Sequence, residues 1–281
     1  MRLSSSVTPP GYVIDSQPGG LASNWAFGWH PGRGGQPRKG FGVERIEGGN
    51  VSERQFHAFE GEDLGPEAII GGEGRLVLDK IPEYFQRFER LILPSRPDTV
   101  QNFRKHLDGR PVVVEVGSGR GRLLCEVALS RPDAVCLGLE TGLGLCGDAL
   151  KRAEKKGASN LFMAWGDARR TIPMLVDPGS ADAAYLLFPD PWWKKKHASR
   201  RHGALTGITI ANALRSGGIL HLKSDVEPYL HEIVAAFLST GMYDRLTDDE
   251  AVIAAMPLTD REVRLTAAGT PVFAAVLLRR A

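Results

Sequence analysis

One short stretch of the chain brings together a carboxylate, aromatic rings and a dense positive charge. An apolar run, residues 183–188, stops at Pro189 and Pro191, and Asp190 stands between these two prolines. Proline fixes φ and cannot donate to a strand ladder, so we expect Asp190 in a stiff turn just past a strand. That end of the strands binds ligands in open α/β sheets. The tryptophans and cationic residues of 192–202 suit stacking and phosphate binding, although a solvated surface turn fits them as well.

A glycine-rich turn follows an earlier apolar run. Residues 112–116 lead directly into Gly117, Gly119 and Gly121, which allow φ > 0 and close approach of a ligand to the backbone. Nicotinamide dinucleotides and S-adenosylmethionine both use such loops. Glu115 favours S-adenosylmethionine, because a carboxylate under the loop would repel a pyrophosphate but attract the amino group of a methionine moiety. The dinucleotide fingerprint also requires a small residue where this chain has an arginine, at position 122.

Two further acids stand at the ends of the next predicted strands. Glu140 follows the run 134–139, where an acidic side chain accepts both ribose hydroxyls, and Asp167 follows the run 160–164, where it could accept from an adenine amino group. Each acid also has a structural interpretation, since Glu115 could be a buried acid and the other two could cap helices. Three acids at successive strand ends, beside a glycine-rich turn, favour the S-adenosylmethionine site.

Strand-like and helix-like runs alternate from residue 111 onward. The alternation predicts an α/β fold with a doubly wound, mostly parallel, seven-stranded sheet. The strand-like runs are 112–116, 134–139, 160–164, 183–188, 219–223, 251–257 and 272–278. The helix-like runs are 120–129, 143–156, 170–175, 205–214 and 227–238. In this arrangement the acids and the glycine turn meet at one edge of the sheet.

The chain divides into three parts by composition. Residues 1–75 are rich in glycine and proline and predict an irregular extension, in which aromatics interleaved with arginine could touch RNA or pack as an arm. Residues 76–110 read as a helical lead-in, with a helical pattern up to position 93. Residues 111–281 form the predicted main domain.

The overall composition is that of a globular protein. The 281 residues carry a net charge of only +2, so nucleic-acid binding would depend on local clusters of charge. Cys125, Cys136 and Cys146 match no metal or redox spacing, and we interpret them as core residues in a reducing compartment. No apolar run is long enough to span a membrane. We therefore expect a cytoplasmic protein with no metal and no membrane partner.

The motifs together resemble those of the bacterial tRNA (guanine(46)-N7)-methyltransferases, a family of class I S-adenosylmethionine-dependent enzymes with a Rossmann-like fold. The resemblance runs from about residue 111 to the end and does not cover the first hundred residues. Its most specific element is Phe188-Pro189-Asp190-Pro191-Trp192, followed in register by Lys194, His197, Arg200 and Arg201. The glycine loop, Glu140, residues 166–168, residues 224–229 and residues 259–264 also match family motifs.

The resemblance implies a methyl transfer from S-adenosylmethionine to N7 of guanine 46 in tRNA. For the oligomeric state of the enzyme we favour a monomer. It implies that Glu115, Glu140, Asp167 and Asp190 contact the cofactor or line the transfer site, with Asp190 as the catalytic residue. It implies that the tRNA guanosine is contacted by Lys194, Asp225, Thr259 and Glu262. The segments 224–227 and 259–262 also fit helix capping boxes, an alternative that the sequence leaves open.

The chain departs from the family pattern in three places. Trp193 replaces a histidine or proline, Arg261 stands where an aromatic residue is common, and the N-terminal extension has no counterpart. Two alternative functions therefore stay open: a methyltransferase of the same fold acting on another RNA or a small purine-like heteroaromatic, and a non-catalytic RNA-binding relative. A dehydrogenase is disfavoured by Glu115.

Overall fold

The computed structural model describes residues 83–192 and 201–281, all of which belong to one compact unit, Asp63–Ala281. The predicted extension, residues 1–75, lies outside the described residues, as do Trp193 and Lys194.

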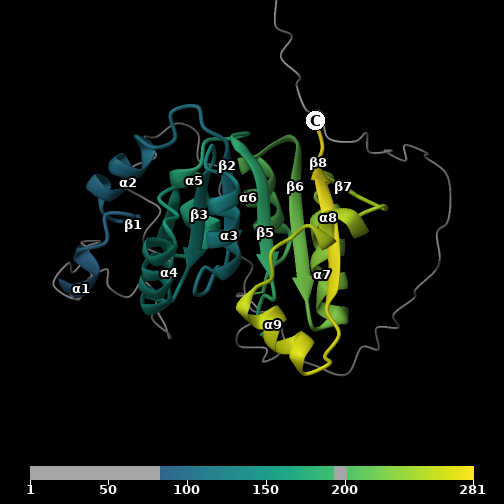
Figure 1. Cartoon of the computed structure of the whole chain (residues 1–281). Helices are drawn as coiled ribbons and strands as arrows, with labels where there is room; N and C mark the ends of the chain where they lie inside the picture. Colours follow the sequence, from purple (N-terminus) through teal and green to yellow (C-terminus); the bar gives the residue numbers. More distant parts are fainter. Residues whose placement is uncertain (1–82, 193–200) are drawn as a thin grey trace, which may run out of the picture. The chain divides into compact units, whose positions relative to one another are not determined.

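A mostly parallel sheet forms the centre of this unit (Figure 1). Its strands lie in the order β1-β4-β3-β2-β5-β6-β8-β7, and only β8 runs antiparallel to its neighbours β6 and β7. The strands are β1 (Leu91–Ile92), β2 (Val112–Val116), β3 (Val135–Glu140), β4 (Leu161–Trp165), β5 (Ala181–Leu187), β6 (Leu214–Ser224), β7 (Tyr243–Arg245) and β8 (Phe273–Arg279). The order reverses between β2 and β5, which is where open α/β sheets place their ligand crevice.

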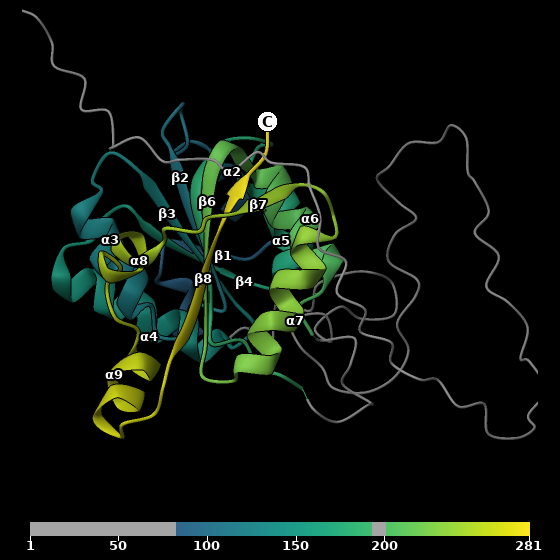
Figure 2. The same ribbon diagram turned by 90° about the vertical axis from the view of Figure 1, so that its right-hand side faces the viewer.

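Helices cover both faces of the sheet, and this confirms the predicted doubly wound α/β class. Figure 2 shows the sheet edge-on, with α3, α4, α8 and α9 on one side and α5, α6 and α7 on the other. The helices are α1 (Glu83–Gln86), α2 (Pro97–Arg104), α3 (Arg122–Ser130), α4 (Leu143–Lys156), α5 (Ala168–Leu175), α6 (Ala204–Ala213), α7 (Glu227–Leu238), α8 (Glu250–Ala254) and α9 (Asp260–Ala267). None of the helices in the described part of the chain is long and apolar enough to cross a membrane.

Side chains of β2 alternate between the two cores. Val112, Val114 and Val116 pack in the core under α5, α6 and α7, while Val113 packs in the core under α3 and α4. Glu115 has the same parity as Val113, so it points to the α3 and α4 side of the sheet. The three cysteines are buried and free in that second core, as expected for core residues.

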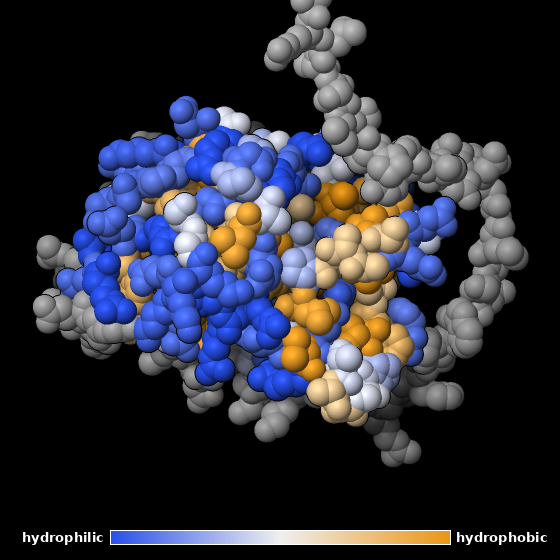
Figure 3. Space-filling model, viewed as in Figure 1, coloured by the Kyte–Doolittle hydropathy of each residue, from blue (hydrophilic) through white to orange (hydrophobic). Residues whose placement is uncertain are grey.

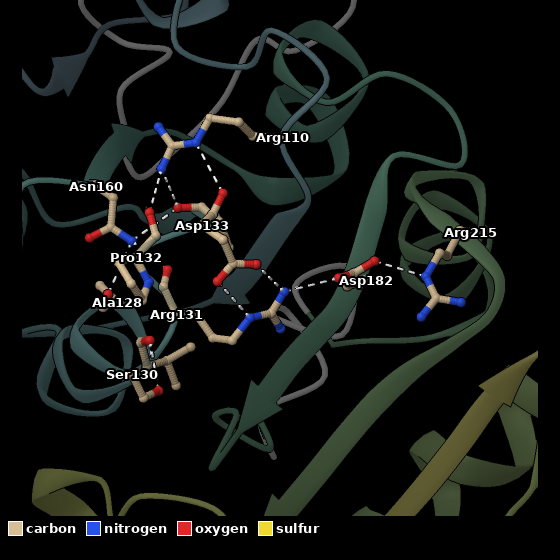
Figure 4. Close-up of polar contacts among 11 residues, drawn as sticks. Arg110, Ala128, Ser130, Arg131, Pro132, Asp133, Asn160, Asp182 and Arg215 are labelled. Atoms are coloured by element: carbon tan, nitrogen blue, oxygen red, sulfur yellow. Dashed lines mark hydrogen bonds and ion pairs between the residues drawn. The ribbon is translucent and has the colours of Figure 1, made fainter. Parts of the chain in front are cut away.

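The amino ends of the strands are closed by a polar network (Figure 4). Arg131 pairs with Asp133 and with Asp182, and Asp182 also pairs with Arg215, so β3, β5 and β6 are linked. The buried Asn160 donates to three backbone carbonyls at 2.9–3.1 Å. This edge of the sheet therefore satisfies its own polar groups within the chain.

Three local predictions were wrong. The segment 251–257 was predicted as a strand, but it contains the helix α8. The acidic residues Asp249 and Glu250 favour the start of a helix, and β7 is the strand at that edge of the sheet. The lead-in pattern up to position 93 is broken by β1, a two-residue strand that pairs with β4 and gives the sheet eight strands in place of seven. The strand predicted at 219–223 begins earlier, at Leu214, and includes Gly217 and Gly218.

Candidate active site

The glycine-rich loop joins β2 to α3 with three left-handed residues. Gly117, Gly119 and Gly121 have φ values of +72°, +53° and +62°, which residues other than glycine rarely adopt. A Cβ atom at Gly121 would lie 2.8 Å from Cβ of Ala149, so this glycine lets α3 approach α4. At Gly117 and Gly119 no described atom would lie within 4 Å of an added Cβ. The backbone of the loop is therefore open on this side for a ligand to approach.

Glu140 fastens this loop to the end of β3. Its Oε2 accepts from the amide of Gly119 at 3.0 Å, and its Oε1 accepts from the amide of Gly142 at 2.9 Å. The structure thus brings Glu140 to the glycine loop. Oε1 also accepts from the hydroxyl of Thr141 at 3.4 Å, so Oε2 is the oxygen that keeps a free lone pair for a hydroxyl of a ligand. Its role in ribose binding stays a prediction.

Glu115 is a buried acid without a full set of partners. The residue is 3% exposed, and its Oε2 has no hydrogen-bond partner among the described residues. Burial raises the pKa of Glu115 to about 8, the backbone amide of Leu124 opposes this, and the charge of Glu140 adds to the increase. Glu115 is therefore mostly protonated at neutral pH, and a cationic ligand group would stabilise its ionised form.

Asp167 caps α5, which is the structural alternative weighed for it in the sequence. Its Oδ1 accepts from the amide of Arg169 at 2.9 Å, and its carboxylate forms an ion pair with the Arg169 guanidinium. Burial alone would raise the pKa of Asp167, but the hydrogen bonds from Arg169 outweigh it and lower that pKa. The contact between Asp167 and adenine stays a prediction. The carboxylate that would make this contact already has a cationic partner.

Asp190 lies in a strained turn at the carboxyl end of β5. Phe188 and Trp192, on either side of the proline–aspartate–proline segment, have φ values of +52° and +43°. Bulky residues in this region cost roughly 1–3 kcal/mol each, and such strain gathers at functional sites. The amide of Phe188 donates to the carbonyl of Lys223 at 2.7 Å, which fixes the turn to β6. Asp190 itself is exposed.

His202 was counted in the sequence only as part of the cationic run, and the structure gives it a different character. Burial and the guanidinium of Arg169 lower the pKa of His202 to about 4, against the opposing charges of Asp167 and Asp190. The imidazole is therefore neutral, although the charges of both acids act on it. No pattern around a single histidine could have predicted this, because the neighbours come from α5 and the β5 turn.

The residues predicted to contact a substrate form a network across β6, α7 and α9. Asp225 accepts from Nη2 of Arg261 at 2.7 Å, and Thr259 Oγ1 accepts from the amide of Glu262 at 3.0 Å. The Glu262 carboxylate does not complete the capping box, since it pairs with Lys223 at 2.7 Å in a nearly fully buried ion pair. Thr259 thus caps α9, as the structural alternative predicted, whereas no pattern in the sequence indicates Lys223 as the partner of Glu262. Lys194 lies outside the described residues.

The surface around this network mixes hydrophilic and apolar residues. Figure 3 shows blue residues over α3 and α4, with apolar residues gathered over β8 and α8. Two basic residues, Arg122 and Arg152, pair with Asp260 at the start of α9 at 3.4 and 2.9 Å. Charged groups from several elements thus line the carboxyl ends of the strands. The network of Figure 4 closes their amino ends.

Known proteins resemble this chain over the same region. A family model described as "Putative methyltransferase" matches residues 109–275. A protein of Thermus thermophilus named tRNA (guanine-N(7)-)-methyltransferase is 36% identical over 160 residues, covering 54% of this chain and 50% of that relative. A protein of the same name from Pectobacterium atrosepticum is 32% identical over 158 residues, covering 55% of this chain and 66% of that relative. The chain therefore spans between half and just under two thirds of the length of these relatives.

Among solved structures, the 16S rRNA methyltransferase KamB aligns with a TM-score of 0.46 and 17% identity. The alignment covers 68% of this chain and 99% of that chain. A similarity of this size is too low to support an argument about function.

Proposed function

We propose that this chain, which belongs to the methyltransferase family whose model matches residues 109–275, transfers a methyl group from S-adenosylmethionine to N7 of a guanine in tRNA. We assign the guanine to position 46, in the variable loop. The observation that carries the proposal is the strained turn around Asp190 at the end of β5, a strand that pairs directly with β2 and its glycine loop. The names of the two relatives support the choice of substrate.

The residues of the loop fit S-adenosylmethionine, which supplies, when bound, a methyl group on a sulfonium. The open backbone at Gly117 and Gly119, with Gly121 behind it, would accept the ligand against the loop. The orphaned Oε2 of Glu115 would receive the cationic amino group, and Glu140 would accept from the ribose hydroxyls. Asp167 would accept from the adenine amino group. The domain that binds S-adenosylmethionine would be residues 111–281.

The protein needs no strong base for this reaction, because N7 of guanine carries a free lone pair. The bond from the methyl carbon to N7 forms as the bond from that carbon to sulfur breaks, and positive charge moves to the purine ring. Asp190 would lie beside that ring and stabilise its developing charge. Positioning supplies the rest of the catalysis.

The substrate would lie over the network at β6, α7 and α9. Asp225, Thr259 and Glu262 would contact the guanosine, and Lys194 with the other cations of 192–202 would hold phosphates. The second oxygen of Glu262 is buried and has no hydrogen-bond partner among the described residues, so it is an unsatisfied acceptor at this end of the sheet. N7 lies on the Hoogsteen edge, and the RNA must therefore present this base unpaired on that edge or extruded.

The proposal is tested by incubating the full chain with labelled S-adenosylmethionine and unmodified tRNA transcripts. The expected result is one 7-methylguanosine in the variable loop, identified by mass and by cleavage at the abasic site. A transcript with adenine at position 46 is the matched control and should accept no methyl group. Transfer to another RNA or to a free purine would favour the same-fold alternative. Binding of the methyl donor without any transfer would favour a non-catalytic relative.

A further inference from the structure

Three consecutive charged residues attach α9 to four other parts of the protein. Asp260 pairs with Arg122 of α3 and Arg152 of α4, Arg261 pairs with Asp225 before α7, and Glu262 pairs with Lys223 of β6. Glu262 is the buried residue of this eight-residue helix. Figure 1 shows α9 at the end of the sheet toward which β5 and β6 point. The helix is therefore held at the proposed site by these ion pairs together with Leu265, which packs against the core under α3 and α4.

Arg261 differs from its two neighbours in what surrounds it. The Glu262–Lys223 pair is almost fully buried, but the Arg261 side chain is 44% exposed. Its guanidinium carbon lies 5.9 Å from the ring centroid of Phe188, the first strained residue of the Asp190 turn. Arg261 thus stands between Asp225 and this turn, at the place where a substrate would enter.

The ion pair restrains one part of the guanidinium and leaves the rest accessible. Nη2 donates to Asp225 at 2.7 Å, which restricts rotation of the planar group. A guanidinium is weakly hydrated on its faces, and arginine planes stack on unpaired bases in RNA recognition. A flat cation held in this way suits a flat, neutral, electron-rich ring.

We propose that Arg261 is a specificity-determining residue of the substrate site, whose guanidinium, held by Asp225 beside Phe188, stacks on the purine presented to the Asp190 turn. This inference rests on the proposed function. It also gives the site a means of separating substrate from product. The guanine that enters is neutral, whereas 7-methylguanine is cationic and is repelled by the guanidinium.

The test compares two substitutions that each keep one property of arginine. Arg261→Lys keeps the charge and can still pair with Asp225, but it has no flat face. Arg261→Phe keeps a flat face without the charge. Arg264, an exposed arginine on the same helix, provides the matched control through Arg264→Phe. For each protein we would measure the KM for unmodified tRNA, inhibition by fully methylated tRNA, and the Kd of S-adenosylmethionine.

The stacking role predicts opposite results for the two substitutions. Arg261→Lys should raise the KM for tRNA about tenfold, as expected for the loss of one stacked base. Arg261→Phe should keep that KM within about threefold but bind methylated tRNA more tightly, because an aromatic face attracts a cationic ring. The Kd of S-adenosylmethionine should be unchanged throughout, which also shows that each variant is folded. Arg264→Phe should behave as the wild type.

Two outcomes would overturn the inference in distinguishable ways. If Arg261→Lys behaves as the wild type while Arg261→Phe loses tRNA binding, the residue acts through its charge and does not stack. If the wild-type chain methylates no tRNA at all, the proposed function fails and this inference fails with it. Weaker inhibition by methylated tRNA in Arg261→Phe would refute the argument on product release.

Discussion

Binding of S-adenosylmethionine should strengthen with pH and should release a proton from Glu115. In the free protein the pKa of this carboxyl is about 8, so the acid is mostly protonated at pH 7. Contact with a cationic amino group requires the ionised form. The ionised fraction is roughly one half at pH 8, one tenth at pH 7 and one hundredth at pH 6. If only that form binds, and only to a protonated amino group that is itself less than fully protonated at pH 8, the Kd should fall about 20-fold between pH 6 and pH 8.

The gain should level off near pH 8, because an α-amino group itself loses its proton at about pH 7.7–8.0. The assay is titration calorimetry at pH 6, 7 and 8, in phosphate and in Tris, whose different ionisation enthalpies report the protons exchanged. Near pH 7 the wild type should release about one proton for each ligand bound.

Two controls isolate the carboxyl. Glu115→Gln keeps the shape of the side chain but cannot ionise, so its binding should be weaker at pH 8, nearly independent of pH and without proton release. 5′-Methylthioadenosine lacks the amino acid part of the ligand and should bind the wild type without this pH dependence. A wild-type Kd that changes less than about threefold from pH 6 to 8, with no proton release, would refute the reasoning about Glu115.

Other predictions concern catalysis, RNA binding and stability. Asp190→Asn should lower kcat about 100-fold or more without unfolding the protein, and undiminished turnover would contradict its role. Lys194→Ala should weaken tRNA binding, increasingly so at low salt, and leave S-adenosylmethionine binding unchanged; an equal loss of both would argue against a phosphate contact. Lys223→Met and Glu262→Leu should each lower the free energy of unfolding by about 3–5 kcal/mol, while the double variant recovers most of it in urea titrations. The folded pKa of His202, about 4, lies below the ordinary 6.5, so unfolded chains bind more protons between these values. Stability should therefore fall as the pH drops from 6.5 to 4, and His202→Gln should reduce that loss.

The fold could be predicted from the sequence wherever an element has its own pattern. The buried run of β2, with all five residues in the core, and the long amphipathic α4 carry their periodicity within themselves. β1 and β7 do not, because strands of two and three residues exist only through pairing with β4 and β8. The apolar run of α8 reads equally well as a strand, and only the tertiary context decides between them.

The positions of the site acids followed from strand ends, but their partners did not. A parallel sheet brings the ends of neighbouring strands together, so Glu140 could be expected near the glycine loop. The pairing of Arg261 with Asp225 joins residues 36 apart in the sequence, and that of Lys223 with Glu262 joins residues 39 apart. Such choices depend on how α9 docks, and no local pattern encodes that.

The environments of the four site acids, more than their residue type, support the roles assigned to them. Glu140 already accepts one backbone amide on each oxygen and is thereby oriented to accept from a neutral hydroxyl. Glu115 is buried with a raised pKa and gains its charge when a cation arrives. Asp190 is exposed at the proposed transfer site and can stabilise a positive charge that develops during the reaction. Asp167 is already paired with the guanidinium of Arg169, so it suits the neutral amino group of adenine better than a charge that develops during the reaction.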